Sequence, residues 1–368
     1  MSLTRKASIS WWQPMVGPKA KEMVSEVIDN NFLNDGPKTT EFEQRIAAIC
    51  KTPFAVAVTS GTAALYLALE AFGIKAGDEV IVPDLTFIAT ANAVSQTGAT
   101  PVLVDVEPKT FNISVDAIKS AITPRTKAIM PVHVSGRPGD MDAILELAKK
   151  HNLRVIEDAA EGLGSHYKGR PLGSIGDAGC FSFSPMKTIA TGQGGMIVVK
   201  DPAVHSRLRE LKDQGRPVRG TGGADMHISL GYNYKFTDLQ AAVGLSQVDD
   251  LPRRVESLRN TYKYYRKNLD GVRGIRVLDF DLQAGEAPQW VDAWVENRDA
   301  LHDTLVANKI YPRKFWFPLH TQMPYQHIKG NFQHSIACSA HGLWLPSALD
   351  LTEVDLAAVC QAIRSSLG

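Results

Sequence analysis

The sequence predicts an α/β protein with two parts. The larger is a three-layer αβα domain with a mainly parallel sheet, and the smaller is an α+β domain at the C-terminal end. Between residues 55 and 158, short apolar runs alternate with segments of helical periodicity, the pattern of parallel strands joined by crossover helices. The last third of the chain lacks that regular alternation. A length of 368 residues and a hydrophobic fraction of 44% allow a large buried core.

The elements of the larger domain follow from periodicity. Two amphipathic helices are expected first, at 18–31 and 40–50, separated by a turn at 34–37. Strands are then expected at 55–58, 79–83, 100–105, 128–134, 154–158, 178–183 and 196–200. The helices between the first five of these strands are expected at 62–72, 88–97, 115–121 and 141–151.

The remaining elements indicate where the domains divide. A helix at 202–215 and a glycine-containing loop at 216–223 precede a long helix at 237–268, which we expect to connect the domains. Later strands are expected at 274–280, 290–295 and 310–317, and later helices at 298–308 and 352–366. We therefore predict a large cofactor-binding domain over residues 1–245, including the N-terminal segment, and a small domain over 246–368.

The composition excludes several classes of protein. The net charge is +1, which provides no basic surface for nucleic acid. No apolar stretch reaches the ~20 residues that span a bilayer, and residues 1–12 do not resemble a signal peptide. Four cysteines without metal-binding spacing favour free thiols, no metal site and a cytoplasmic location. A P-loop motif and a dinucleotide-binding fingerprint are also missing from the sequence.

A lysine between an apolar strand and a glycine cluster is the first candidate for chemistry. The neighbours of Lys187 are apolar or small, and no run of charges surrounds it, unlike the usual solvated lysine. Shielded lysines of this kind form imines with aldehyde cofactors. Asp158 ends a second apolar run, at the carboxyl end of a strand, where open α/β sheets bind ligands. A carboxylate there can pair with the protonated ring nitrogen of pyridoxal phosphate.

A third stretch provides a phosphate site. Residues 56–69 predict a strand, a turn and a helix, with Ser60 as a plausible N-cap. The N–H groups of Gly61 and Thr62 would then point outward at the helix start, where the free amides and the helix dipole favour phosphate. The three stretches together predict a pyridoxal-phosphate site.

In this order, the three stretches resemble the DegT/DnrJ/EryC1 family of sugar aminotransferases, and the similarity extends from residue 32 to residue 347. These are pyridoxal-phosphate enzymes of the aspartate aminotransferase fold type, fold type I. The resemblance implies ping-pong transamination through a Lys187 Schiff base, with glutamate as the usual amino donor. The pattern is most similar to the perosamine-synthase-like branch, which implies a nucleotide-linked 4-keto-6-deoxy sugar as acceptor and a role in O-antigen, capsule or antibiotic sugars.

The resemblance also assigns residues around the cofactor. It implies that Gly61, Thr62 and Ser182 bind the phosphate and that Ser60 belongs to the same cofactor-binding turn. Glu161 would contact the phenolic oxygen of the cofactor or shield its ring, and Phe87 would stack on that ring, an arrangement that favours aromatic pairs by ~0.5–1.5 kcal/mol.

Further assignments concern a second subunit and the substrate. Asn233 resembles the family asparagine that reaches the phosphate from the neighbouring subunit, which implies a homodimer with shared active sites. His320 lies in a Pro-Leu-His stretch that resembles the sugar-pocket region of the family. Arg313, a few residues earlier, is a candidate to contact an anionic group of the substrate.

Three alternatives remain open from the sequence. The related sugar 3-dehydratases carry a histidine in place of the lysine, so Lys187 argues against that reaction. An aminotransferase for a cyclitol or another keto substrate, or an aminohydroxybenzoate-type synthase, is compatible with the same fold. A non-catalytic regulator on this scaffold is the alternative from another class. Retention of Lys187, Asp158 and Ser182 argues against that regulator.

Overall fold

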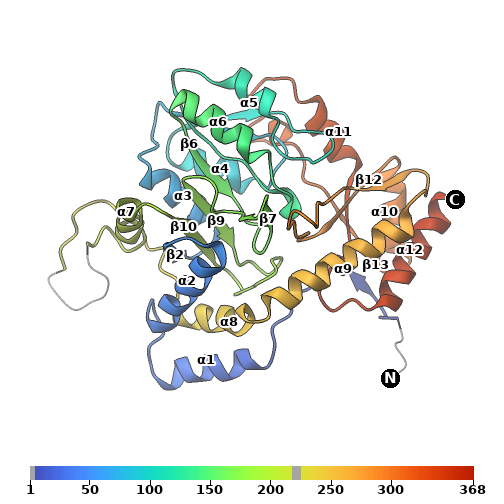
Figure 1. The fold of residues 1–368 in the computed structure, drawn as a ribbon, viewed down its shortest axis with the longest axis horizontal. Helices are drawn as coiled ribbons and strands as arrows, with labels where there is room; N and C mark the ends of the chain where they lie inside the picture. Colours follow the sequence, from blue (N-terminus) through green and yellow to red (C-terminus); the bar gives the residue numbers. More distant parts are fainter. Residues whose placement is uncertain (1–4, 218–224) are drawn as a thin grey trace.

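The computed structural model of the protein describes residues 5–217 and 225–368. Its centre is a seven-stranded sheet in the order β2-β10-β9-β6-β5-β3-β4 (Figure 1). The strands are β2 (Phe54–Val58), β3 (Glu79–Pro83), β4 (Thr100–Val104), β5 (Thr126–Ile129), β6 (Arg154–Asp158), β9 (Ala178–Ser182) and β10 (Gly195–Val199). Strand β10 runs antiparallel to β2 and β9, and the other neighbours are parallel. The predicted mainly parallel sheet is confirmed.

Helices cover both faces of this sheet. Because side chains alternate along a strand, Val56 and Val58 pack toward α3, α4 and α7, whereas Ala55 and Ala57 pack toward α2 and α8. Near β4, helices α5 and α6 extend the second of these layers over the apolar side chains of β3, β5 and β6. These helices are α2 (Pro37–Cys50), α3 (Gly61–Ala71), α4 (Ala89–Gln96), α5 (Val115–Ala121), α6 (Met141–His151), α7 (Pro202–Lys212) and α8 (Asp238–Val248).

A second sheet follows the long helix α9 (Leu251–Leu269) in the chain and has the strand order β11-β12-β15-β14. Its core is closed by α9, α10 (Arg298–Ala307) and α12 (Glu353–Leu367). The strands are β11 (Ile275–Val277), β12 (Val291–Val295), β14 (Arg313–Lys314) and β15 (Gly342–Leu345). The N-terminal strand β1 (Ile9–Ser10) also joins this part, because it pairs in parallel with β13 (Ile310–Tyr311). The predicted division at residue 245 stays a prediction.

The smaller elements complete the fold around these two sheets. They are α1 (Lys19–Asp29), the turns η1 (Val134–Gly136) and η2 (Leu319–Thr321), the hairpin β7 (His166–Tyr167) and β8 (Arg170–Pro171), and α11 (Gln333–His341). The sequence did not indicate α11, because its segment lacks a run of apolar residues at helical spacing. The predicted loop at 216–223 lies mostly outside the described residues.

Several predicted elements are wrong in extent. The strand expected at 128–134 is β5 at Thr126–Ile129, with Val134 already in η1, and the strand expected at 274–280 is β11 at Ile275–Val277. Proline explains two further cases. The single helix expected at 237–268 is two helices, because α8 ends at Val248 and α9 starts at Leu251. Pro252 in the first turn of α9 has no N–H, and its ring would clash with a helical carbonyl four residues earlier. The strand expected at 310–317 is divided at Pro312 into β13 and β14, which pair with different strands.

Across residues 5–217 and 225–368, the structure has no helix that is both long and apolar enough to cross a bilayer. In the same ranges, no group of histidine, cysteine and acidic side chains could hold a metal ion. Cys50, Cys180, Cys338 and Cys360 are buried free thiols.

Candidate active site

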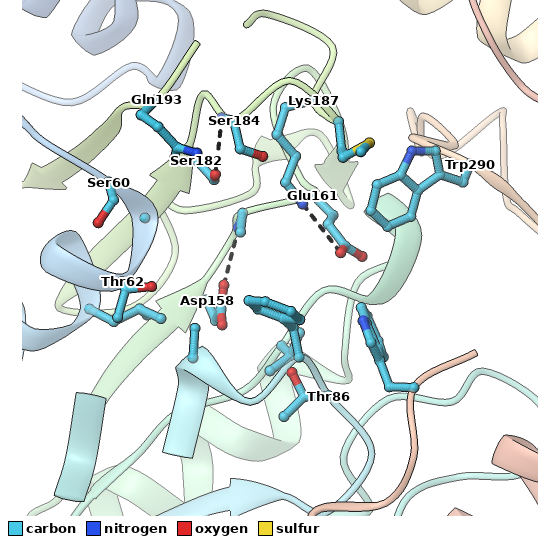
Figure 2. Close-up of a pocket in the computed structure, with 18 of the residues that line it drawn as sticks. Ser60, Thr62, Thr86, Asp158, Glu161, Ser182, Ser184, Lys187, Gln193 and Trp290 are labelled. Carbon is cyan, nitrogen blue, oxygen red and sulfur yellow. Dashed lines mark hydrogen bonds and ion pairs between the residues drawn. The ribbon is translucent and has the colours of Figure 1, made fainter. Parts of the chain in front are cut away.

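A cavity of about 320 Å³ lies where the carboxyl ends of the central strands meet the second sheet (Figure 2). It is lined by most of the predicted site residues, namely Ser60, Gly61, Thr62, Phe87, Asp158, Glu161, Ser182, Lys187 and Arg313. Strand direction explains why they meet. Strands β6 and β9 are parallel neighbours, and β2 points the same way as β9 because the antiparallel β10 separates them. Their carboxyl ends therefore share one edge of the sheet.

Lys187 lies in the turn after β9 with its amine directed into the cavity (Figure 2). Its side chain is 12% exposed, and Nζ lies 3.4 Å from Oε1 of Glu161. Nζ also lies 4.7 Å from the centre of the Trp290 ring, a distance at which the ring attracts a cation. Lys187 is thus a shielded amine with one carboxylate and one aromatic face beside it.

The backbone around Lys187 is held by the second part of the molecule. The side-chain oxygen of Gln289 accepts hydrogen bonds from the N–H of Thr188 at 3.1 Å and from its hydroxyl at 2.6 Å. The amide nitrogen of Gln289 donates to the carbonyl of Met186 at 3.3 Å. One side chain therefore fixes the residues on both sides of the lysine, which the sequence did not indicate.

Asp158 is the last residue of β6 and is 5% exposed. Its carboxylate accepts hydrogen bonds from the hydroxyl of Thr90 at 2.8 Å and from the N–H of Ala160 at 3.2 Å. Burial raises the pKa of Asp158, while those hydrogen bonds and the charge of Lys187 oppose the rise. A strongly buried carboxylate in a cavity is a site where a cationic group of a ligand would be stabilised.

Glu161 follows on the same turn and is also buried. Its Oε2 accepts a hydrogen bond of 2.7 Å from the N–H of Ser135. Burial raises the pKa of Glu161, whereas the charge of Lys187 and the Ser135 N–H lower it. The carboxylate is thus directed at the lysine by a backbone group from a neighbouring turn.

The start of α3 forms the opposite end of the cavity (Figure 2). The Ser60 hydroxyl accepts the N–H of Ala63 at 3.1 Å, so it caps the helix as expected. The N–H groups of Gly61 and Thr62 open the helix, where no intrahelical acceptor exists for them. A Cβ at Gly61 would lie 2.9 Å from the Cβ of Ser182, so only glycine lets the helix start approach that serine so closely.

Aromatic side chains make up much of the remaining wall. Phe87 lines the cavity and is 54% exposed. Trp290, Trp316 and Trp344 also line the cavity and were not predicted. The sequence places these tryptophans in or near predicted elements. A tryptophan there more often belongs to a hydrophobic core than to a binding site, so the sequence did not mark them as site residues.

Arg313 enters the cavity from β14. Its guanidinium lies 4.9 Å from the ring centre of Trp11 and 5.5 Å from that of Trp344. Desolvation lowers the pKa of Arg313, and Glu161 opposes this from a distance. No carboxylate among the described residues lies within ion-pair distance of it. A half-buried cation without such a partner is suited to an anionic ligand.

Two predicted residues lie outside the cavity wall. Asn233 is exposed and forms an isolated bridge with Asp213. His320 lies in η2, where Nδ1 is 2.7 Å from the buried carboxylate of Asp84 and the ring stacks on Phe332. The described contacts give His320 a role in joining η2 to the end of β3.

The cavity residues fit pyridoxal phosphate. At one end is a shielded amine that can bond an aldehyde carbon, and near the middle is the buried carboxylate of Asp158, suited to a protonated ring nitrogen. At the other end the first N–H groups of α3, those of Gly61 and Thr62, have no intrahelical acceptor and can bind an oxyanion. The amine, the carboxylate and the phosphate cradle thus occur in one cavity.

Comparisons with known proteins agree with this fit. The profile of the DegT/DnrJ/EryC1/StrS aminotransferase family matches residues 14–364. A GDP-perosamine synthase from Caulobacter vibrioides is 39% identical over 367 residues, covering 98% of each chain. Among solved structures, DesV from S. venezuelae, in complex with a ketimine intermediate, has a TM-score of 0.90 at 34% identity over 94% of each chain.

A further solved structure, 3-amino-5-hydroxybenzoic acid synthase, has a TM-score of 0.91 at 26% identity, covering 96% of this chain and 97% of its own. The whole-chain profile and the 39% identity establish the relationship. The chain belongs to the DegT/DnrJ/EryC1/StrS aminotransferase family, and its cofactor is pyridoxal phosphate.

Proposed function

We propose that this aminotransferase moves an amino group from glutamate to a nucleotide-linked keto sugar, with a 4-keto-6-deoxyhexose as the acceptor. The observation that carries the proposal is the Lys187–Glu161 pair in one cavity with Asp158 and the start of α3. The 39% identity to a GDP-perosamine synthase over nearly the whole chain supports the choice of acceptor. We expect the product to enter O-antigen or other polysaccharide biosynthesis.

When bound, pyridoxal phosphate supplies an electron sink for the carbon that bears the amino group. Lys187 Nζ would hold the aldehyde end and, once released, act as the base and acid that moves a proton from and to that carbon. Asp158 would keep a proton on the ring nitrogen by pairing with its positive charge. Glu161, 3.4 Å from Nζ, would stabilise the positive charge on the lysine.

The phosphate group of the cofactor is an anion, so it needs hydrogen-bond donors and no carboxylates around it. The N–H groups of Gly61 and Thr62 and the hydroxyl of Ser182 would bind the phosphate oxygens, while Ser60 caps the helix that presents them. Phe87, which is 54% exposed, would stack on the ring. These contacts would orient the cofactor so that its aldehyde end reaches Lys187.

A spectral titration tests the proposal. The near-visible absorbance of the bound cofactor should disappear when glutamate is added and return when the correct nucleotide-linked keto sugar follows. A panel of such sugars, with different nucleotides and keto positions, would identify the acceptor. If glutamate leaves the absorbance unchanged, the proposed donor or the proposed reaction is wrong. If no coloured cofactor binds, a regulatory protein becomes the better explanation.

Replacing Arg313 by glutamine should weaken the binding of an anionic substrate. A charge-assisted hydrogen bond contributes about 1.5–3 kcal/mol, so the loss should be roughly 10- to 100-fold. Each half-reaction is titrated separately, so that an effect on glutamate is distinguished from an effect on the nucleotide sugar. The exposed Arg276 of β11 provides the matched control, Arg276→Gln. Wild-type affinity for both substrates in Arg313→Gln would contradict the assignment.

We also propose a homodimer in which Asn233 of one copy completes the phosphate site of the other. Asn233 is exposed and outside the cavity of its own chain, which is compatible with such a role. Asn233→Ala should release the cofactor about tenfold more readily, in equilibrium dialysis, with the dimer preserved. Asn260→Ala, on the exposed side of α9, is the control. A monomer with full activity in analytical ultracentrifugation would refute the shared site.

A second acceptor class is favoured by one observation. The likeness to 3-amino-5-hydroxybenzoic acid synthase, with a TM-score of 0.91, supports a non-nucleotide cyclic ketone such as a cyclitol as the alternative acceptor. The same spectral titration separates the two, because a free cyclic ketone would then restore the absorbance.

For either acceptor, four buried free cysteines fit the reducing conditions of the cytoplasm, where we place the enzyme.

A further inference from the structure

Ser135 has a backbone conformation that is uncommon for a residue with a side chain. It lies in η1 with φ of 55° and ψ of 21°, in the left-handed region. Residues other than glycine rarely occupy this region and remain there when surrounding contacts fix them. Ser135 is fully buried, so its contacts are with other parts of the protein.

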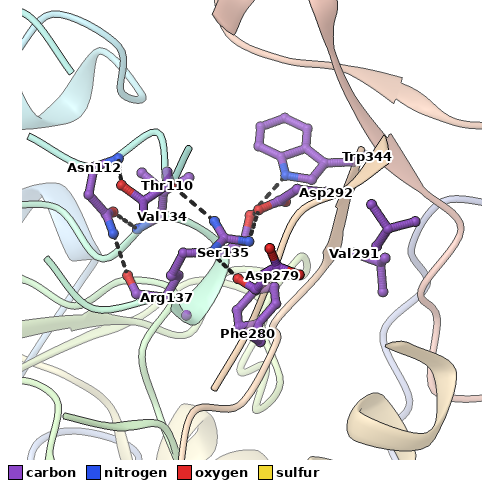
Figure 3. Close-up of polar contacts among 12 residues, drawn as sticks. Thr110, Asn112, Val134, Ser135, Arg137, Asp279, Phe280, Val291, Asp292 and Trp344 are labelled. Carbon is purple, nitrogen blue, oxygen red and sulfur yellow. Dashed lines mark hydrogen bonds and ion pairs between the residues drawn. The ribbon is translucent and has the colours of Figure 1, made fainter. Parts of the chain in front are cut away.

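Every polar group of Ser135 has a partner. Its N–H donates to Oε2 of Glu161, and its carbonyl accepts the N–H of Gln289, both at 2.7 Å. Its hydroxyl donates to Oδ1 of Asp292 at 2.6 Å and accepts from the indole N–H of Trp344 at 2.9 Å (Figure 3). Three of these partners follow α9 in the chain, so the second part of the molecule holds this turn.

Asp292 is itself fixed by charge. It is completely buried, and Oδ2 lies 2.9 Å from a nitrogen of the buried Arg137. Arg137 donates to the carbonyls of Asp279 at 2.8 Å and Thr110 at 3.0 Å, and its guanidinium lies 4.1 Å from the centre of the Phe280 ring (Figure 3). Breaking a buried ion pair leaves a charge without a partner, so Asp292 is strongly held in place.

Glu161 is the group that this turn directs into the cavity. The charged side chains that influence it are Lys187, Arg313, Asp158 and Asp292. Burial raises the pKa of Glu161, the lysine and the Ser135 N–H lower it, and the two aspartates add to the rise. The N–H of Ser135 therefore helps to keep the carboxylate ionised and aimed at the lysine.

From these contacts we infer that Ser135, fixed by Asp292 and Trp344, is a positioning residue that holds Glu161 against Lys187. The inference rests on the proposed role of Lys187 in holding the cofactor. The hydroxyl acts indirectly, because its two hydrogen bonds keep the backbone in the conformation that points the N–H at Glu161. The second sheet thus contributes to the charge balance at the lysine.

A pair of substitutions separates this role from packing. Ser135→Ala removes both hydroxyl contacts but keeps a side chain that disfavours the left-handed conformation, whereas Ser135→Gly removes the contacts and permits it. The readout is the pH midpoint of the near-visible absorbance in the holoenzyme, which reports protonation at the Lys187 nitrogen. Without a directed carboxylate nearby, the protonated form loses stabilisation, so Ser135→Ala should lower the midpoint by about one pH unit. Ser135→Gly should return it close to the wild-type value.

The outcomes decide between the explanations. An unchanged midpoint in folded Ser135→Ala would overturn the inference, and so would equal shifts in the alanine and glycine variants. If Ser135→Ala does not fold, Trp344→Phe removes one hydroxyl contact and must lower the midpoint. A wild-type midpoint in that variant would also refute the inference. Glutamate is added to the wild-type enzyme in parallel, because an unresponsive wild type would refute the proposed function instead.

Discussion

Lys187→Ala is expected to remove transamination almost completely. Among the described residues, the cavity lining contains one other cation, Arg313 of β14. No other lysine lines the cavity among the described residues, so no second amine could replace Nζ in moving the proton. Proton transfer by a positioned side chain contributes about 10²- to 10⁴-fold, and covalent attachment is lost as well. We therefore expect turnover to fall by at least about 10³-fold.

The measurement is stopped-flow absorbance of the glutamate half-reaction, with cofactor content determined in the same samples. Lys200→Ala, at an exposed position after β10, is the matched control and should behave as wild type. Loss of a half-buried ammonium should also leave Glu161 without its cation, so the variant should bind protons at that carboxylate more readily. Full activity of Lys187→Ala would overturn the assignment of the site.

The three local motifs were predictable from sequence because each depends on residues that are adjacent in the chain. An apolar strand that ends in Asp158, a strand that leads to Lys187, and Ser60 before a helix all carry their own signal. The parallel pairing of β6 and β9 then brings two of them to one edge of the sheet without further information. A strand-end position is therefore enough to predict that these groups meet.

The residues that support the lysine were not predictable in this way. Gln289 and Ser135 act through docking of the second sheet against the first, and no local pattern marks them. A serine in the left-handed conformation is particularly hidden, because sequence rules expect glycine or asparagine there. The break between α8 and α9 was missed, but the sequence does contain its signal, because Pro252 cannot continue a helix from α8.

Asp158→Asn is expected to reduce turnover by about 10- to 10³-fold while the protein stays folded. An opposite charge within contact distance shifts a pKa by about one to three units, and an amide cannot supply that charge to a ring nitrogen. The substitution keeps the size of the side chain. The hydroxyl of Thr90 donates to Asp158 and also lies 3.1 Å from the carbonyl oxygen of Phe87. If the asparagine amide turns its NH₂ group toward Thr90, the hydroxyl can still donate to that carbonyl.

The control for this prediction is the exposed Asp303, whose substitution by asparagine should leave turnover unchanged. A cofactor analogue with a methylated ring nitrogen carries its positive charge permanently and does not depend on a carboxylate to keep it. If Asp158 acts by stabilising that charge, the analogue should make Asp158→Asn and wild type nearly equal in the glutamate half-reaction. If the deficit persists, Asp158 serves mainly to hold Thr90 and the turn at Ala160, and the electrostatic role is wrong.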